Sequence, residues 1–147
     1  MSPTVEEVFV PTLAAVRPAR ARNIAVIATS TESTLSALRK AGALANRLRA
    51  CITLIVPHVV PYPLPLNQPP VPLDFNARRF RVLAGANPVK TTVRIYLCRD
   101  QGEILRNILP PHSVVVIGGR RSWWPTKEKH LARQLRRCGH EVVFAHT

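Results

Sequence analysis

The chain has 147 residues, of which 46% are hydrophobic, a composition that suits one globular domain and excludes disorder throughout. Its 21 lysines and arginines stand against 8 acidic residues, and the formal net charge of +13 predicts attraction to anionic partners without choosing among them. No uninterrupted apolar run reaches the roughly eighteen residues of a membrane span, and the first residues carry acid where a secretory signal carries lysine or arginine. We therefore predict a cytoplasmic protein without a membrane segment.

Residues 1–22 show no clear periodicity and are predicted to be an N-terminal tail or loosely docked arm, followed by a domain over residues 23–147. Residues 24–28 form a short apolar run that is typical of a strand buried on both faces. Hydroxyls at residues 29–31 can cap a helix, and leucines and alanines then recur every three or four positions up to residue 48. Residues 52–56 predict a second buried strand.

Residues 57–72 are rich in proline, which disfavours a helix and favours extended backbone. Such a segment suits an adaptor's aromatic groove, but a stiff surface loop is the interpretation we adopt. Asp74 is expected to begin a short helix that ends near residue 84. Residues 91–97 alternate in polarity, which predicts a strand less buried than its neighbours.

Asp100 and Glu103 form a pair resembling a capping box at the start of the next helix. Residues 113–117 are the clearest buried strand, and Gly118 with Gly119 is expected to let the backbone turn at its end. An amphipathic helix over residues 127–138 and a final strand over residues 141–146 complete the pattern. The alternation predicts a three-layer α/β/α fold with a five-stranded, mostly parallel, doubly wound sheet.

The sequence offers no pattern typical of a catalytic or metal site. Cys51, Cys98 and Cys138 are widely separated and odd in number, so we interpret them as small core residues and not as disulfide or zinc ligands. The histidines lack metal-ligand spacing. We find no G-x-S-x-G elbow, no cysteine with a clear local partner and no suggestively spaced pair of carboxylates. We predict no catalytic residue and no bound metal.

The order of elements, with a long gap after the second strand and Val-Val-Val-Ile-Gly-Gly before the last helix, resembles the universal stress protein family. The resemblance covers residues 23–147, and its local matches are residues 27–30, 54–56 and 116–118. It implies a Rossmann-like, adenine nucleotide α-hydrolase-like fold and a homodimer formed through the last strand. The interface residues would be Val142, Val143, Phe144 and Ala145, an apolar edge that also favours pairing on physical grounds.

ATP-binding members of that family carry an Asp after the first strand and a G-x2-G-x9-G-[ST] loop after the fourth. Here Ala28 stands at the Asp position and Gly118 at the first glycine, whereas Arg121 replaces the second glycine. The Gly-Ser pair falls near Glu128 and Lys129, across a loop that is too short. The resemblance therefore implies that ATP is not bound in the usual way, and we predict no cofactor.

Basic side chains in the altered loop can still bind another anionic ligand, and a nucleotide is one alternative. Ligands of doubly wound sheets bind at the carboxyl ends of the strands. The candidate ligand-binding residues are Ala28, Thr29, Ser30, Val56, Gly118, Gly119, Arg120, Arg121 and Lys127. The adjacent Trp123 and Trp124 are expected to pack onto the domain or a subunit partner, with stacking on an adenine or nucleic-acid base as the alternative.

Together these features predict a non-catalytic, dimeric regulator that resembles universal stress proteins. It would act in a stress response through protein contacts or an anionic ligand. One alternative is a basic protein that binds nucleic acid without sequence preference, because of the net charge and the arginines on the outer face of the last helix. The other alternative is an ATP-binding universal stress protein.

Overall fold

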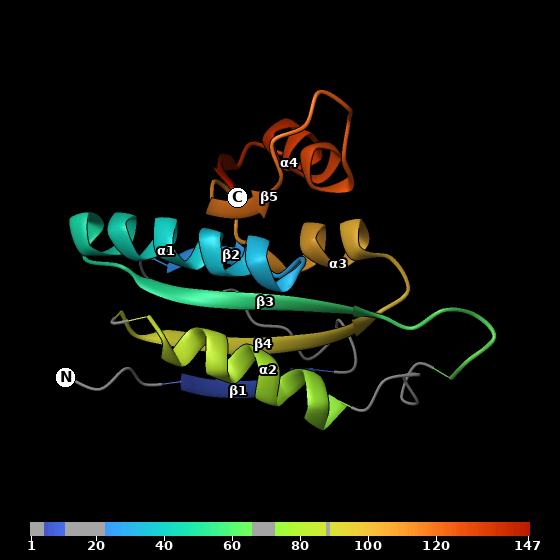
Figure 1. Cartoon of the computed structure of the whole chain (residues 1–147). Coiled ribbons are helices and arrows are strands. Elements are labelled where there is room, and N and C mark those ends of the chain that lie inside the picture. The colour runs from blue at the N-terminus through green and yellow to red at the C-terminus, as the bar shows by residue number, and fades with distance from the viewer. Residues whose placement is uncertain (1–4, 11–22, 66–72, 88) are drawn as a thin grey trace.

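The computed structural model describes residues 5–10, 23–65, 73–87 and 89–147. Its strands and helices alternate from β2 onward, as the sequence predicts (Figure 1). In chain order the elements are β1 (Val5–Val10), β2 (Asn23–Ile27), α1 (Thr31–Leu48), β3 (Cys51–Val59), α2 (Leu73–Gly85), β4 (Thr91–Cys98), α3 (Gln101–Ile108), β5 (Val114–Gly119), α4 (Lys127–Arg137) and β6 (Glu141–His146).

One six-stranded sheet runs through the molecule in the order β1-β4-β3-β2-β5-β6, and every neighbouring pair is parallel. The predicted α/β fold class is confirmed, with one strand more than the five expected. The added strand, β1, lies within the predicted tail or arm and pairs with β4 from Val5↔Thr91 to Val10↔Tyr96. Residues 11–22 lie outside the described residues. Successive strands from β2 to β4 are added on one side of β2, and β5 and β6 are added on the other side. Doubly wound sheets bind ligands at such a switch in strand order, here between β2 and β5.

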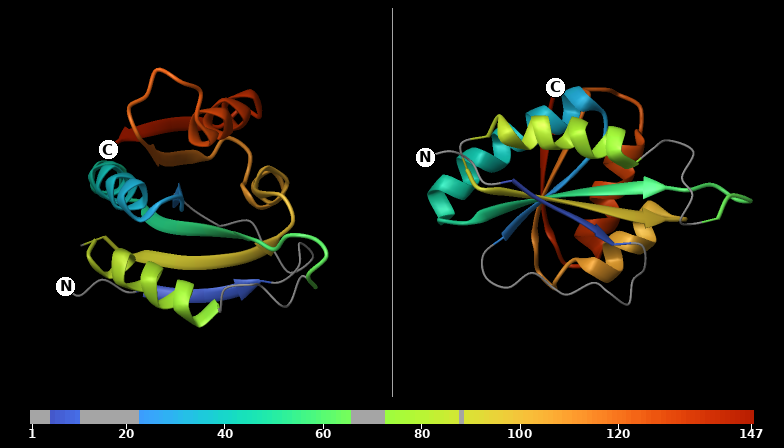
Figure 2. Two further views of the ribbon diagram at one scale, coloured as in Figure 1. Left: turned by 45° about the vertical axis from the view of Figure 1, so that its right-hand side comes forward. Right: turned by 90° about the horizontal axis from the view of Figure 1, so that it is seen from below.

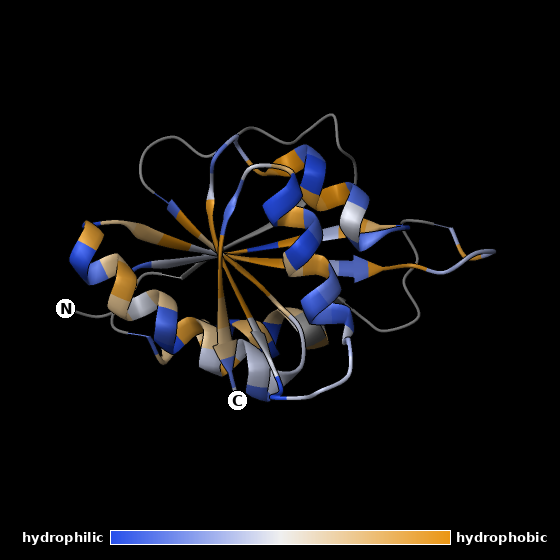
Figure 3. Cartoon of the chain, turned by 90° about the horizontal axis from the view of Figure 1, so that it is seen from above, coloured by the Kyte–Doolittle hydropathy of each residue, from blue (hydrophilic) through white to orange (hydrophobic). Residues whose placement is uncertain are grey.

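Helices cover both faces of the sheet. Figure 2 shows α1 and α2 on one face and α3 and α4 on the other. Each face has its own core: Ile24, Val26, Leu38 and Ile52 belong to the first, and Ile27, Leu105, Ile117 and Leu135 to the second. The strands are largely apolar and the helices turn polar faces outward (Figure 3). No helix in the described part of the chain is long and apolar enough to cross a membrane.

β3 continues through Pro57 to Val59, so the prediction that the proline-rich loop begins at residue 57 is wrong. The reason is the length of the neighbouring strand. β2 ends at Ile27, which is paired with Ile55, and beyond that point β3 pairs only with β4. Ile55 turns its carbonyl toward β2, where it accepts from the Ala28 N–H at 2.9 Å. Pro57 has the same orientation, so its missing N–H faces the side where β2 has ended.

β4 is more buried than the polarity pattern predicted. Thr92 and Arg94 are half-buried, as the alternation suggested, but Tyr96 is only 2% exposed. The strand lies inside the sheet, between β1 and β3. Tyr96 is covered because it packs with Ile55 and Ile104 in the core on the face that carries α3 and α4.

The cysteines do not all lie in the core. Cys98 is buried, whereas Cys51 and Cys138 are exposed, so the core interpretation is wrong for two of the three. Both exposed cysteines lie at element ends, at the start of β3 and just after α4. Spacing in the sequence does not distinguish such positions from the interior of a strand.

Candidate functional site

The predicted ligand residues come together at the carboxyl ends of β2, β3 and β5, but only some of them line a cleft. The cleft has a volume of about 220 Å³, below the roughly 300–1,000 Å³ of typical ligand pockets. Among the predicted residues it is lined by Ala28, Thr29, Ser30 and Lys127. The other predicted residues, Val56, Gly118, Gly119, Arg120 and Arg121, do not line it.

Four further residues line this cleft and were not predicted from the sequence: Pro57, Gln101, Glu128 and Leu131. Gln101 is the first residue of α3, and Glu128 and Leu131 lie three positions apart on α4, on one face of the helix. That spacing is the only sequence signal that marks them. A carboxylate at Glu128 works against binding of a phosphate, because like charges repel.

Hydroxyl groups at the start of α1 are already used within the fold. Ser30 caps the helix, and its Oγ accepts from the Ser33 N–H at 3.2 Å. Thr34 Oγ1 accepts from the Thr29 N–H at 3.0 Å, and Thr29 Oγ1 donates to the Gly118 carbonyl at 3.4 Å. These groups join α1 to the ends of β2 and β5, and the Thr29 hydroxyl would have to leave the Gly118 carbonyl before it could donate to a phosphate.

Gly118 and Gly119 are needed for packing. Both are buried within β5, so the prediction that they turn the backbone is wrong. A Cβ added at Gly118 would lie 1.9 Å from the Ser33 carbonyl oxygen, and one added at Gly119 would lie 2.4 Å from Phe144 Cζ. Close approach of α1 and of an aromatic ring therefore explains both glycines.

The loop after β5 closes on itself and on the start of α4. Thr126 caps α4, and its Oγ1 accepts from the Lys129 N–H at 3.2 Å. Lys129 Nζ donates to the Ser122 carbonyl, and Ser122 Oγ accepts from the Trp124 N–H at 3.1 Å. The Thr126 hydroxyl thus accepts a hydrogen bond from a backbone N–H in the first turn of α4. Backbone N–H groups at this place in a helix bind phosphate in nucleotide-binding loops.

Trp123 and Trp124 project from this loop into solvent, with exposed fractions of 102% and 77%. The expectation that they pack onto the domain is therefore wrong in this chain. Packing against a subunit partner stays a prediction. Arg120 and Arg121 precede the indoles and are also exposed. The loop offers two aromatic faces beside two guanidinium groups, a combination that stacks on bases and pairs with phosphates.

Burial shifts the pKa of three groups, Cys98, His58 and His140, toward their neutral forms. Burial, with the charges of Asp100 and Glu103, raises the pKa of the Cys98 thiol to about 11, so it stays protonated at neutral pH. Burial lowers the pKa of His58 and of His140 from its ordinary value, so both are neutral imidazoles at pH 7. Among the described residues no group of three or more His, Cys, Asp or Glu side chains could hold a metal ion.

No protein-family model matches the chain, and no curated protein matches it either. Solved structures do. A universal stress protein family member from Burkholderia pseudomallei superposes with a TM-score of 0.58 at 21% identity, covering 85% of this chain and 96% of that one. A macrolide-efflux protein from Streptococcus pneumoniae gives a TM-score of 0.55 at 10% identity, covering 97% of this chain and 58% of that one.

A universal stress protein in complex with cAMP gives a TM-score of 0.49 at 17% identity, covering 86% of this chain and 97% of that one. The Burkholderia pseudomallei match confirms the predicted fold: the chain is similar to that universal stress protein family structure over nearly its whole length. At these identities the likeness concerns the fold alone.

Proposed function

We propose that this protein is a non-catalytic, dimeric regulator with a universal stress protein-like fold, which acts in a stress response without binding ATP in the usual way. The observation that carries the proposal is the packing of Gly118 against Ser33 and of Gly119 against Phe144. Glycines of a phosphate loop leave their backbone open to the ligand. Here both are covered by the protein's own atoms, and Ala28 offers no acceptor for a ribose.

The small size and mixed charge of the cleft support the same proposal. Lys127 is its cation and Glu128 its anion, and the two are adjacent in the first turn of α4. A small anion that contacts Lys127 fits these dimensions better than a nucleoside triphosphate. Regulation through contacts with other proteins, or with a second copy of this chain at β6, requires no small ligand.

Thermal unfolding in the presence of ATP, AMP, cAMP and inorganic phosphate tests the proposal. We expect shifts of the unfolding temperature no larger than those given by sodium sulfate at equal ionic strength, because a protein with net charge +13 attracts any anion. Saturable stabilisation by ATP that is lost in Lys127→Gln and retained in Arg133→Gln would overturn it. Arg133 is exposed on α4 and does not line the cleft, so its substitution removes the same charge elsewhere.

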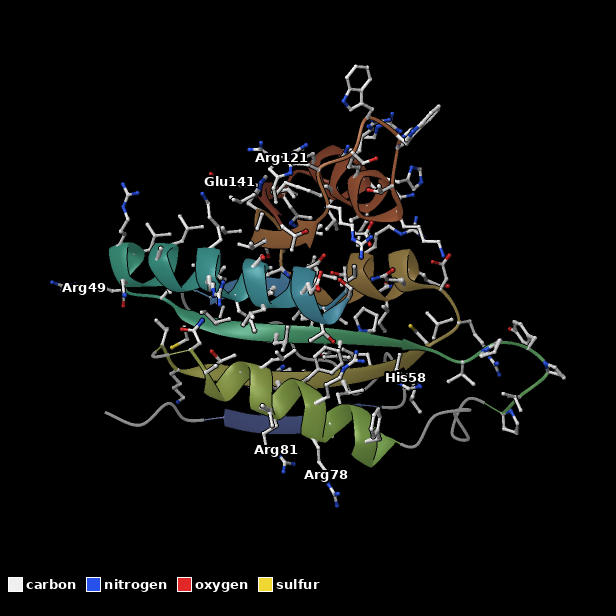
Figure 4. All side chains as sticks on the ribbon, viewed as in Figure 1. Arg49, His58, Arg78, Arg81, Arg121 and Glu141 are labelled. Atoms are coloured by element: carbon white, nitrogen blue, oxygen red, sulfur yellow. The ribbon has the colours of Figure 1, made fainter. Side chains whose placement is uncertain are left out.

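The exposed indoles favour a second candidate function, binding of single-stranded nucleic acid without sequence preference. Trp123 and Trp124 can stack on bases while Arg120 and Arg121 pair with phosphates. The remaining charge is not focused on this loop: Figure 4 places Arg121 beside α4, Arg78 and Arg81 on α2 at the opposite edge, and Arg49 at one end of α1. This spread of charge is why we rank the nucleic-acid function second.

Fluorescence anisotropy with a labelled oligothymidylate distinguishes the two candidates. Nucleic-acid binding predicts an affinity that falls steeply with salt and drops at least tenfold when both tryptophans become alanine. The matched control is Phe75→Ala with Tyr62→Ala, which removes two other exposed aromatic rings, 62% and 79% exposed. Equal affinities for the two double variants would rule out a stacking role of the indoles.

A further inference from the structure

A second, larger cavity lies away from the carboxyl-terminal cleft. Its volume is about 540 Å³, within the range of small-molecule sites. Part of its lining comes from the beginnings of β2 and β5, at Asn23, Ile24 and Val114. The carboxyl-terminal cleft lies beyond the other ends of these strands, so the two sites share no lining residue.

The floor of this cavity is the sheet face that also carries α3 and α4. Ala25 is paired with Thr53, and Ile55 is paired with Arg94, so neighbouring strands present these side chains on one face. In Figure 2 (right) α3 and α4 both lie toward the end of the sheet at which the arrows of β3 and β4 terminate. The end of α3 and the segment after it, from Ile108 to Val114, supply the wall.

Most of the lining is apolar, and one cation stands at its edge. Ala25, Ile55, Ile108 and Leu109 are carbon surfaces, whereas Arg94 of β4 brings a guanidinium group. Arg94 is half-buried, and its Nε atom is buried without a hydrogen-bond partner among the described residues. A buried donor on a charged group that lacks a partner is costly, and native structures usually supply an acceptor from protein, water or ligand.

The acidic residue that lines the cavity is too far away to be this acceptor. Glu141 begins β6, four strands from β4 in the order β4-β3-β2-β5-β6. At about 4.8 Å per strand this places the two backbones roughly 19 Å apart. Glu141 therefore does not neutralise Arg94, whereas a ligand that carries its own negative charge would.

We infer that this cavity binds an amphipathic monocarboxylate, whose carboxylate pairs with Arg94 and whose apolar body lies over Ala25 and Ile55. Carboxylate and guanidinium match in geometry and form charge-assisted hydrogen bonds. Thr53 lies diagonally across from Arg94 and offers a hydroxyl to the second carboxylate oxygen. The inference is independent of the proposed regulatory function, because it concerns the other end of the strands.

Decanoate, with decanol as its uncharged analogue, is the probe that tests this site by calorimetric titration at fixed ionic strength. We expect saturable binding of one decanoate per chain and at least tenfold weaker binding of decanol. Arg94→Met should weaken decanoate binding at least tenfold, and Arg133→Met, which removes an exposed charge on α4, should change it less than twofold. Equal decanoate affinity in Arg94→Met and the unsubstituted protein would overturn the inference, as would the absence of saturable binding.

A spectroscopic readout on the unsubstituted protein keeps the inference testable if Arg94→Met fails to fold. The Arg94 Nε–H gives its own proton–nitrogen NMR cross-peak, separate from those of the backbone amides, and a new hydrogen bond to carboxylate moves that proton downfield. Decanoate should shift this signal in step with the calorimetric isotherm, and decanol should not. An Arg94 signal that does not move on saturation with decanoate would overturn the inference.

Discussion

The ring of Phe144 in β6 closes over Gly119 in β5, with only 2.4 Å between Phe144 Cζ and the place where a Cβ on residue 119 would lie. The same ring lies against His146, with 5.0 Å between ring centroids. Gly119 follows Gly118, the first glycine of the family's loop pattern, and is thus the floor of an aromatic contact at the edge of the sheet. Packing accounts for a glycine that was predicted among the candidate ligand-binding residues.

Gly119→Ala should lower the free energy of unfolding by roughly 1–3 kcal/mol, because the added methyl must displace the Phe144 ring. Shortening that ring with Phe144→Leu should reduce the penalty of the alanine, so the two changes are coupled. Gly118→Ala should be more damaging and show no such rescue, since its Cβ would meet the Ser33 backbone carbonyl at 1.9 Å. Urea unfolding of the single and double variants measures both effects. Additive penalties for Gly119→Ala and Phe144→Leu would contradict the contact.

Asn87 joins α1 to the segment that precedes β4. Its Nδ2 donates to the Leu38 carbonyl at 2.8 Å, its Oδ1 accepts from the Val89 N–H at 3.0 Å, and it is only 6% exposed. Asn87→Ala should cost roughly 1–3 kcal/mol, because a buried carbonyl and a part-buried N–H lose the Asn87 side chain as a partner. The matched control is Asn107→Ala, which removes an exposed bond from Asn107 Nδ2 to the Glu103 carbonyl at 2.7 Å. Chemical unfolding should find little change in the control, and equal losses would contradict a special role of Asn87.

His140 makes the stability of the protein depend on pH. Its Nδ1 accepts from the Ser113 N–H at 3.1 Å, which only the neutral imidazole can do. Burial, and then the charge of His112, lower the pKa of His140 below the ordinary value of 6.5. A lowered pKa means that the unfolded chain binds more protons, so stability falls as the pH drops through 6.5 toward the folded value.

The free energy of unfolding measured from pH 7.5 to pH 5 checks this expectation. His140→Gln should flatten the profile in part, since the buried His58, whose pKa is also lowered by burial, contributes a slope of the same sign. His130→Gln, at an exposed position on α4, is the control and should leave the profile unchanged. A profile that His140→Gln leaves as steep as before would show that the Ser113 bond does not carry the effect.

Much of the fold follows from local patterns in the sequence. Apolar runs mark the cores of β2, β3 and β5, and Asp100 caps α3 as predicted, with its side chain accepting from the Gly102 N–H at 2.8 Å. β1 escapes such reasoning because its sequence, VEEVFV, has no strict alternation. Only pairing with β4 defines it.

The candidate site was less predictable because its residues act through tertiary neighbours. Nothing near Pro57 in the sequence says that β2 ends opposite Ile55, and nothing near Gly118 says that α1 approaches it. Arg94 is one of the alternating positions of residues 91–97, which predicted only a strand less buried than its neighbours. Its Nε has no hydrogen-bond partner in the described part of the chain, and Arg94 lines a cavity. The cavity depends on where the segment from Ile108 onward lies over the sheet, which is a tertiary property.

The outer edge of β6 offers a defined set of outward backbone groups to the proposed homodimer. Glu141 and Thr147 donate their N–H groups inward, to the carbonyls of Ser113 and Gly119, both at 3.0 Å. By alternation, Val142, Phe144 and His146 turn their N–H and carbonyl groups outward. The Val142 carbonyl already accepts from Arg136 Nη2 at 3.3 Å, so Arg136 partly protects this edge. A two-fold axis would pair two β6 strands antiparallel through these groups.

His146→Pro should therefore weaken the dimer while changing the unfolding temperature little, because it removes an outward N–H and an exposed side chain. The loss occurs twice across a two-fold axis, which amounts to roughly 1–3 kcal/mol in the dimer free energy. Thr147→Pro is the control, since it removes an inward bond within the chain and should leave the dimer intact. Arg136→Ala should strengthen the dimer by freeing the Val142 carbonyl. Sedimentation equilibrium measures all three, and an unaltered dimer constant in His146→Pro would place the interface elsewhere.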